Sequence, residues 1–449
     1  MRMAANRNRN TCKRVATGLA LAFCAGRIPV PAASAAEPEA ALALALQHRV
    51  EALTAPALAG RAAGSPGGHA ATDTLVSWFA AAGLQPAFGD AYTQEFPLTG
   101  KGWTGDDLSG LTGRNVAAVA PGAGALAGRW LVVAAHLDHL GTVAPPSPSA
   151  TVPGPGDYYP GANDNASGVA VVHETARRLR VGAGEASRRS VLVLNTDGEE
   201  SGLQGAAWFV KHPCIALDSL DAMVNLDTVG HLSDGRLIVS GLATADPLEA
   251  AVNAAAVAVG IPVNPSRGGW SGSDHMVFNT REVPVLFLFG GPYPEYNRPA
   301  DTAAALDYAA MARITAFTDA LVGHLRTVPG RFAWHMVGGG DLRDQAEGGT
   351  AATDKPGNRQ TWLGTMPDFT EGQAGYRLAA VFDGSPAAAV GLQKGDVLVR
   401  FGDYDVTDLA TFTTALRAYG PGDLVEIAIL RDGRDMRFTV ALGDRAQRR

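Results

Sequence analysis

From residue 42 to about residue 328, apolar runs of strand length alternate with amphipathic stretches of helical length. Strands joined by helices in this way pair into a parallel or mixed sheet that is covered on both faces by helices. The continuous apolar runs at 130–135, 190–194 and 283–289 are typical of strands buried on both faces. The sequence therefore predicts an α/β fold with a mixed, mostly parallel sheet and these runs as central strands.

The first 35 residues have the pattern of a secretory signal. Four basic residues between positions 7 and 14 precede an apolar run at 15–26, and Ala33-Ser34-Ala35 offers small residues for cleavage. The sequence 21–24 resembles a lipoprotein box, but Phe23 stands where a small residue belongs, so we do not expect a lipid anchor. No later apolar run reaches the roughly 18 residues needed to span a bilayer. We expect the protein to be exported, either periplasmic or secreted.

The composition changes after residue 328. The stretch 338–359 is rich in glycine, has little apolar periodicity and is typical of a linker. Short strand patterns and one helix pattern follow, and they predict a second, small α+β domain of roughly 80 residues. The expected division is a signal peptide at 1–35, an α/β domain at 36–328, a linker at 329–359 and a small domain at 360–445.

The net charge of the chain argues against one class of partner, nucleic acid. The chain carries 44 acidic and 37 basic residues, a net charge of −7, and no basic stripe. Affinity for nucleic acid rests largely on neutralising phosphates, so we expect no nucleic-acid partner.

Metal-binding side chains lie near four consecutive predicted strand ends. They are His136 and Asp138 after the first run, Asp164 at a helix start, Glu199 and Glu200 after the second run, and Asp227 after the run at 222–226. Each has an ordinary explanation by itself, such as a helix cap or a solvated acidic loop. Ligands of open α/β sheets bind at the carboxyl ends of strands, so the four together predict one joint metal site.

The order of these motifs resembles the co-catalytic zinc aminopeptidases of the bacterial leucyl aminopeptidase and aminopeptidase Y type. It runs His-x-Asp, Gly-Ala-x-Asp-x-Ala-Ser-Gly, Glu-Glu-Ser-Gly-Leu-x-Gly, Asn-x-Asp and Ser-Asp-His-x-x-Phe, over roughly residues 50 to 325. The resemblance implies the zinc exopeptidase fold and two zinc ions. The implied roles are His136 and Asp227 on one zinc, Asp164 bridging, Glu200 on the other zinc, Glu199 as general base and Asp138 orienting His136. Two such ions activate a water, and a nearby carboxylate can take its proton.

One position departs from that family. The last zinc ligand of the family is a His in a Tyr-His-x-Pro-x-Asp-Thr stretch, where this chain has Tyr296-Asn297. An amide oxygen is a weak zinc ligand beside imidazole or carboxylate, so we expect the Glu200 site to be weakened or empty. The resemblance implies two bound zinc ions, whereas the replacement of the histidine by Asn297 predicts about one. His275 and His139 are the histidines that could compensate.

The second unit resembles bacterial PDZ domains over nearly its full length, on Gly384-Ser-Pro386, Gly391-Leu-Gln-Lys-Gly395-Asp396 and Pro421-Gly-Asp423. The resemblance implies a groove for an extended peptide or a protein C-terminus beside a helix that starts at Leu409. Residues Gly375, Tyr376, Arg377 and Leu378 loosely match the carboxylate-binding loop of such domains. Docking against the α/β domain is an equally good interpretation.

The function expected from the sequence is that of an exported metallo-exopeptidase, an aminopeptidase acting on peptide substrates. Two alternatives stay open. One is a degenerate peptidase that works as a peptide-binding or scaffold protein through its PDZ domain. The other is a single-zinc acyltransferase of the glutaminyl cyclase type.

Overall fold

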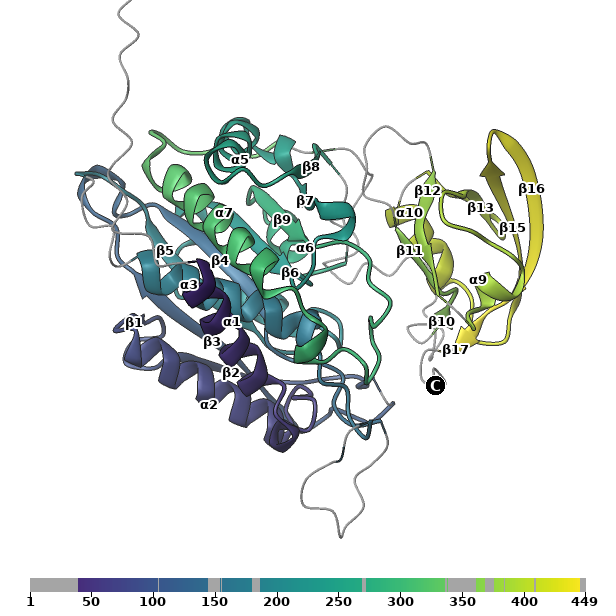
Figure 1. The fold of residues 1–449 in the computed structure, drawn as a ribbon, viewed down its shortest axis with the longest axis horizontal. Coiled ribbons are helices and arrows are strands. Elements are labelled where there is room, and N and C mark those ends of the chain that lie inside the picture. The colour runs from purple at the N-terminus through teal and green to yellow at the C-terminus, as the bar shows by residue number, and fades with distance from the viewer. Residues whose placement is uncertain are drawn as a thin grey trace, which may run out of the picture.

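The computed structural model describes residues 39–103, 105–143, 154, 156–179, 186–268, 272–335, 337, 361–367, 375–382, 384–407 and 409–444. The expected signal peptide at 1–35 and the linker residues 338–359 lie outside these ranges. Figure 1 shows an α/β domain, coloured purple to green, beside a smaller C-terminal domain in yellow.

Nine strands of the described residues form the sheet of the α/β domain, in the order β1-β3-β5-β4-β6-β9-β7-β8 with β2 on β3. They are β1 (Gln85–Pro86), β2 (Thr93–Pro97), β3 (Thr112–Ala120), β4 (Trp130–His136), β5 (Ser190–Thr196), β6 (Leu220–Asp227), β7 (Leu237–Ser240), β8 (Val263–Ser266) and β9 (Val285–Phe289). The central strands β5, β4, β6 and β9 pair in parallel, whereas β3 and β7 pair antiparallel to their inner neighbours. The predicted mixed, mostly parallel sheet is confirmed.

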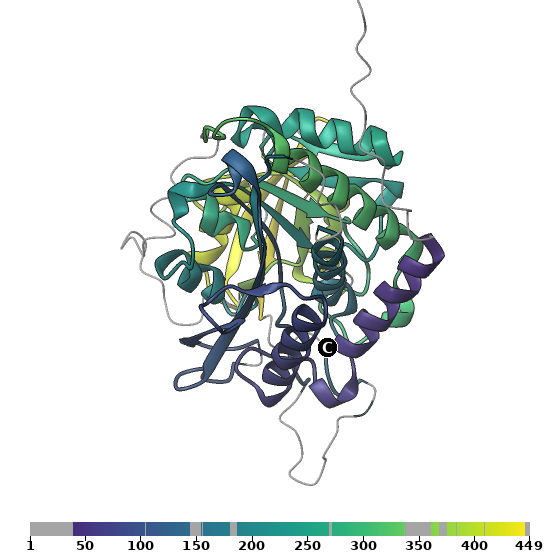
Figure 2. The same ribbon diagram turned by 90° about the vertical axis from the view of Figure 1, so that its left-hand side faces the viewer.

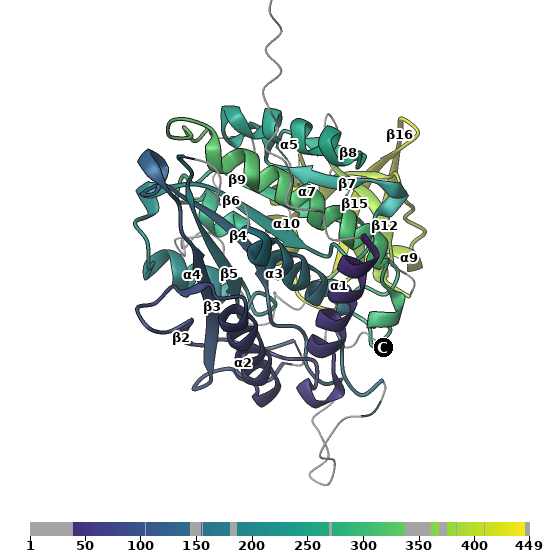
Figure 3. The same cartoon turned by 60° about the vertical axis from the view of Figure 1, so that its left-hand side comes forward.

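Helices cover both faces of this sheet. They are α1 (Glu39–Leu53), α2 (Pro66–Ala81), α3 (Gly168–Leu179), α4 (Gln204–Lys211), α5 (Asp246–Val259), α6 (His275–Asn279) and α7 (Tyr308–Thr327). Figure 3 shows α1, α3, α5 and α7 lying across one face of the sheet, and α4 and α6 contribute to the apolar cluster on the other face.

The alternation of side chains along β4 explains its continuous apolar run. Leu131, Val133 and Ala135 belong to one apolar cluster, while Val132 and Ala134 belong to the cluster on the opposite face. Successive side chains of a strand point to opposite faces, so a strand buried on both faces needs apolar residues at every position.

The C-terminal domain is built on antiparallel pairing. Its strands are β10 (Thr361–Trp362), β11 (Thr365–Pro367), β12 (Tyr376–Val381), β13 (Val397–Phe401), β14 (Tyr404–Asp405), β15 (Leu424–Arg431), β16 (Arg434–Ala441) and β17 (Gly443–Asp444), with helices α9 (Pro386–Ala389) and α10 (Leu409–Arg417). The sheet runs β11-β12-β13-β15-β16, and β10 pairs with β17. The domain has an apolar core of its own.

Aromatic side chains join the two domains. Phe287 and Phe289 of β9 share an apolar cluster with Phe382, which follows β12. The ring of Tyr296 stacks on that of Phe382 with 6.1 Å between ring centroids. Figure 2, turned by 90°, shows the yellow strands behind the sheet of the α/β domain.

Residues 329–335, which the sequence assigns to the linker, pack on the α/β domain instead. The buried Arg189 donates to the backbone oxygens of Val328 and Gly330, and its guanidinium lies 4.3 Å from the ring centroid of Phe332. Phe332 is 3% exposed, and its amide donates to Asp221, the ion-pair partner of Arg189. We therefore propose that the α/β domain extends to about residue 337.

We predict that a chain ending after Val337 folds without the C-terminal domain, whereas a chain ending after Val328 is less stable. The shorter chain loses the Phe332 ring and the Gly330 acceptor that cover Arg189. Removing a large buried aromatic group lowers the free energy of unfolding by about 3 to 5 kcal/mol. Thermal unfolding of the two truncated chains measures the difference. Equal melting temperatures would show that residues 329–337 do not belong to the domain.

Candidate metal centre

The carboxyl ends of three parallel strands meet at one edge of the sheet. His136 is the last residue of β4 and Asp227 the last residue of β6, and Glu199 and Glu200 follow β5. Asp164 lies in the helical turn Ala162–Ser167 that leads into α3. These five of the six side chains from which the sequence predicts one joint site therefore reach the same edge, and the sixth, Asp138, lies two residues after His136.

One group of donors contains His136, Asp164 and Asp227. The Nε2 atom of His136 lies 3.2 Å from Oδ1 of Asp164 and 3.5 Å from Oδ1 of Asp227. Zinc bonds of about 2.0 to 2.2 Å in a tetrahedron separate donor atoms by about 3.3 to 3.6 Å. The spacing and the chemistry of this group therefore fit a zinc ion.

A second group contains His139, Asp164 and Glu200. The Nδ1 atom of His139 lies 2.7 Å from Oε1 of Glu200, and Nε2 of the same ring is buried with no hydrogen-bond partner in the described residues. Asp164 belongs to both groups, which is the arrangement that a bridging carboxylate requires. From the sequence alone, His139 was only one of two histidines that could compensate for Asn297.

Asp138 makes contacts that its spacing from His136 did not predict. Its carboxylate accepts hydrogen bonds from the backbone amides of Glu199 at 3.0 Å and Glu200 at 3.2 Å. The Nδ1 atom of His136 lies 3.2 Å from the backbone oxygen of Asp138 and 3.8 Å from its carboxylate. Asp138 therefore holds the acidic loop after β5 in place as well as lying beside His136.

The electrostatics of the site follow from burying several charges together. Burial works to lower the pKa of His136, but the carboxylates of Asp227 and Glu199 raise it well above its usual value. Burial and the charge of Glu200 raise the pKa of Asp164 to about 6. Carboxylates gathered this closely repel one another, which a bound cation relieves.

Burial also shifts the pKa values of Glu199 and His139, in directions that suit a base and a metal ligand. Burial raises the pKa of Glu199 well above its usual value, which makes its carboxylate a stronger base. Burial lowers the pKa of His139 to about 3, so its imidazole is neutral, and neutral imidazole is the form that binds metals.

Arg61 is a site residue that sequence reasoning missed. Its fully buried guanidinium donates to the backbone oxygens of Leu53, Leu137, Pro160, Gly161 and Asp164. These acceptors include the loop after β4 and the turn that carries Asp164. No motif marks Arg61, because its acceptors lie up to 103 positions away along the chain.

The segment around Asn297 also supports the turn of Asp164. The carboxylate of Asp301 accepts hydrogen bonds from the amides of Asn163 and Asp164, and it accepts a third from the Tyr293 hydroxyl at 3.1 Å. Asn297 is 6% exposed, has φ of 56°, and its Oδ1 atom has no hydrogen-bond partner in the described residues. His275 is in neither donor group and stacks on Phe287 with 4.4 Å between ring centroids.

The four residues expected at the peptide groove lie at the start of β12. The side chains of Tyr376 and Leu378 are buried in the core of the C-terminal domain, and Tyr376 stacks on Phe412 of α10 with 4.1 Å between centroids. Arg377 is half-buried, and Gly375 has φ of 99°. Strand β12 pairs with β13 on one side and with the short β11 on the other. Any peptide contact at this strand therefore uses its backbone more than these two buried side chains.

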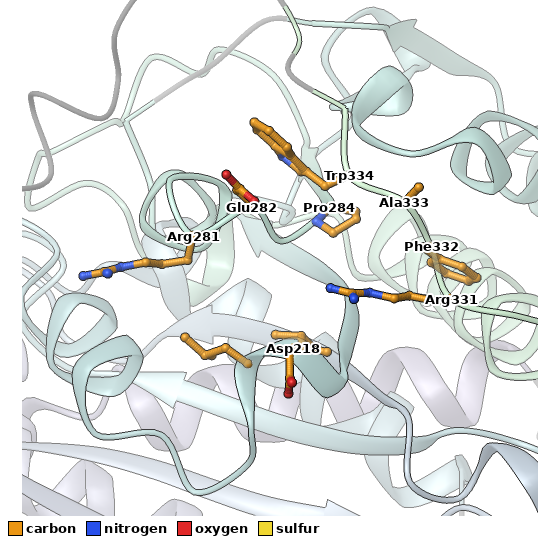
Figure 4. Close-up of a pocket in the computed structure, with 10 residues that line it drawn as sticks. Asp218, Arg281, Glu282, Pro284, Arg331, Phe332, Ala333 and Trp334 are labelled. Carbon is orange, nitrogen blue, oxygen red and sulfur yellow. The ribbon is translucent and has the colours of Figure 1, made fainter.

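A surface hollow of about 460 Å³ lies elsewhere, between the segment 281–284 and the segment 331–334 (Figure 4). None of its lining residues belongs to either donor group, so this hollow is separate from the candidate metal centre. None of the described helices is both long enough and apolar enough to cross a membrane.

Comparisons with known proteins agree with this architecture. Residues 115–322 match Peptidase family M28, and residues 364–442 match the PDZ domain. A search of curated proteins finds no match.

Among solved structures, the chain is similar to BSAP, a zinc aminopeptidase from Bacillus subtilis, with 15% identity, 64% of this chain and 95% of that chain covered, and a TM-score of 0.52. It is also similar to the LapA aminopeptidase of Legionella pneumophila, with 19% identity and a TM-score of 0.46. That match covers 71% of this chain and 81% of LapA. A glutaminyl cyclase from Porphyromonas gingivalis is 18% identical to this chain, with a TM-score of 0.49. That match covers 63% of this chain and 98% of the cyclase. The likeness to BSAP shows a shared fold. The two family matches show a Peptidase family M28 domain at residues 115–322, followed by a PDZ domain at residues 364–442.

Proposed function

We propose that the protein is a zinc-dependent exopeptidase that removes N-terminal residues from peptides. The observation that carries this proposal is the pair of donor groups that share Asp164, with the unshared carboxylate of Glu199 next to Glu200. This arrangement matches the needs of peptide-bond hydrolysis, in which a carbonyl is polarised and a water loses its proton.

In this proposal, His136 and Asp227 would hold one zinc, Glu200 would help to hold a second, and Asp164 would be shared by both. Zinc bound at these groups supplies a Lewis acid for the carbonyl and lowers the pKa of water. The chain itself positions these side chains. The Asp138 carboxylate accepts hydrogen bonds from the amides of Glu199 and Glu200, and the Asp301 carboxylate accepts one from the amide of Asp164.

Glu199 is the proposed general base. It is adjacent to Glu200 but belongs to neither donor group, so its carboxylate is available to accept a proton and pass it to the leaving amine. Its raised pKa, which burial causes, favours that exchange. Glu199 is also partly exposed, so a substrate can reach it.

The open side of the site favours a free amino terminus. His136 and His139 are 2% and 1% exposed, whereas Glu199, Glu200 and Asp227 are half-buried. Because Glu200 and Asp227 are proposed zinc ligands, the amino group at the free end of a peptide can approach the metals and the carboxylates beside them. This access for an amino group supports an aminopeptidase over an enzyme that cleaves within chains.

We further propose that the protein is exported, on the basis of the signal-like pattern at 1–35. Mass spectrometry of the protein recovered from its native host gives the first residue of the mature chain. A mature chain that retains residues 1–35 would refute export by this signal.

The substitution Glu199→Gln tests the proposed general base. The substitution keeps the shape of the side chain and removes the base, so we expect turnover of aminoacyl-p-nitroanilides to fall by at least about 100-fold. Zinc content and thermal unfolding should not change. Glu426→Gln, at an exposed position of the C-terminal domain, is the matched control and should keep full activity. Unchanged turnover in a zinc-loaded Glu199→Gln protein would remove Glu199 from the mechanism.

Peptides with a free and with an acetylated amino terminus test the preference for a free amino terminus. N-acetylation blocks the amino group that would approach the metals and the neighbouring carboxylates, and we expect kcat/KM to fall by about 100-fold, or about 2.8 kcal/mol. Mass spectrometry of the products of paired free and acetylated peptides provides the measurement. Equal cleavage of both peptides contradicts an aminopeptidase, and conversion of glutaminyl peptides to pyroglutamyl peptides without cleavage indicates the acyltransferase alternative.

A further inference from the structure

The second donor group raises a question that the sequence left open. Asn297 stands where the co-catalytic zinc aminopeptidases have a histidine ligand. Without that histidine, a metal held by Asp164 and Glu200 alone would lack any nitrogen donor. Zinc sites in proteins use nitrogen and sulfur donors together with carboxylates. Some other imidazole must therefore complete the group if a second zinc binds firmly.

We propose that His139 is the imidazole ligand of this second zinc, in place of the histidine that is missing at position 297. The inference rests on the proposed function and goes beyond it, because it assigns a metal-binding role to a residue outside the ligand set that the resemblance implies. The loop after β4 then serves both sites, with His136 on one zinc and His139 on the other.

The geometry carries the assignment. Ligand atoms of His139, Asp164 and Glu200 all lie within 4.8 Å of one another, and Nδ1 of His139 lies 2.7 Å from the Glu200 carboxylate. The His139 side chain is fully buried, and its Nε2 atom has no partner in the described residues. The Nδ1 contact turns the ring toward Glu200, and at 2.7 Å it is a hydrogen bond, so a zinc held by both groups would separate these two atoms to about 3.3 to 3.6 Å.

The fold makes specific room for this ring. A Cβ atom at Gly161 would lie 2.4 Å from Cδ2 of His139 and 2.5 Å from its Cγ, so any larger residue at 161 would displace the imidazole. Gly161 also has φ of 59°, which favours glycine. The backbone amide of His139 is held by the oxygen of Arg61 at 3.3 Å. The glycine-rich turn thus seats both Asp164 and the His139 ring.

A cation also explains why two carboxylates share this position. Asp164 and Glu200 are each close to His139 and to one another, and like charges this close destabilise the site unless a cation or proton lies between them. Asn297 offers only a neutral amide oxygen, so it is at most a weak addition to the same site. We therefore expect the protein to bind about two zinc ions rather than the one that Asn297 suggested.

The test counts zinc in the full-length protein. Purified wild type, His139→Ala, His139→Gln and Asn297→Ala are dialysed against a mild chelator, and bound zinc is measured by inductively coupled plasma mass spectrometry. We expect about two ions in wild type and Asn297→Ala, and about one in both His139 variants. His231→Gln, which changes a histidine outside both groups, is the matched control and should keep both ions.

A second readout reports the ligand itself. Cobalt(II) absorption in the visible range depends on the donor atoms, so loading with Co²⁺ should give wild type a band that both His139 variants lack. Adding Asn297→His to His139→Ala should restore the second metal, since it returns a nitrogen donor at the family position. His139→Gln keeps a polar side chain of similar length, so it remains informative if His139→Ala fails to fold.

Several outcomes would overturn the assignment. If the His139 variants keep two zinc ions, or if Asn297→Ala loses one, then His139 is not the ligand. A wild type that already holds only one zinc overturns it as well. A failure of the proposed function would look different. The wild type would then hold two zinc ions and the His139 variants about one, but no variant and no wild type would hydrolyse any aminoacyl substrate.

Discussion

The buried guanidinium of Arg61 is the contact on which the candidate metal centre depends. It is 0% exposed, and it donates to backbone oxygens at the end of α1, in the loop after β4 and in the turn that precedes α3. Hydrogen bonds from a charged donor to buried oxygens are stronger than those between neutral groups. By donating to these oxygens together, Arg61 holds the loop of His136, Asp138 and His139 against the turn of Asp164.

The charge of Arg61 matters as much as its hydrogen bonds. Burial lowers its pKa to about 10, which still leaves it positively charged, and the carboxylates of Asp301, Asp164, Asp138 and Glu200 act in the opposite direction. A permanent cation beneath this acidic cluster reduces the repulsion between its members. The loops that supply metal ligands are thereby kept close before any metal binds, which reduces the reorganisation that binding requires.

The two domains are joined by a contiguous series of contacts that ends at the metal centre. Phe382 of the PDZ domain stacks on Tyr296, which packs edge-on against Tyr293 with 5.8 Å between centroids. The Tyr293 hydroxyl donates to Asp301, which in turn accepts from the amide of Asp164. The PDZ domain therefore rests on the segment that contains Asn297. This contact supports the docking interpretation of the domain, and β11 already pairs along part of the strand that a peptide would join.

The sequence alone determined the element types, the α/β class and the positions of chemistry at strand ends. These follow from local rules, because apolar periodicity sets strand and helix, and a residue after a parallel strand must lie at the sheet edge. The tertiary structure alone decided which distant groups meet. It brought His139 rather than His275 to Glu200, set the Asp138 carboxylate against two amides, and placed Arg61 under residues up to 103 positions away. It also packed Phe332 on the α/β domain, where the sequence suggested a linker. Such contacts depend on the path of the whole chain, and a local pattern carries no information about them.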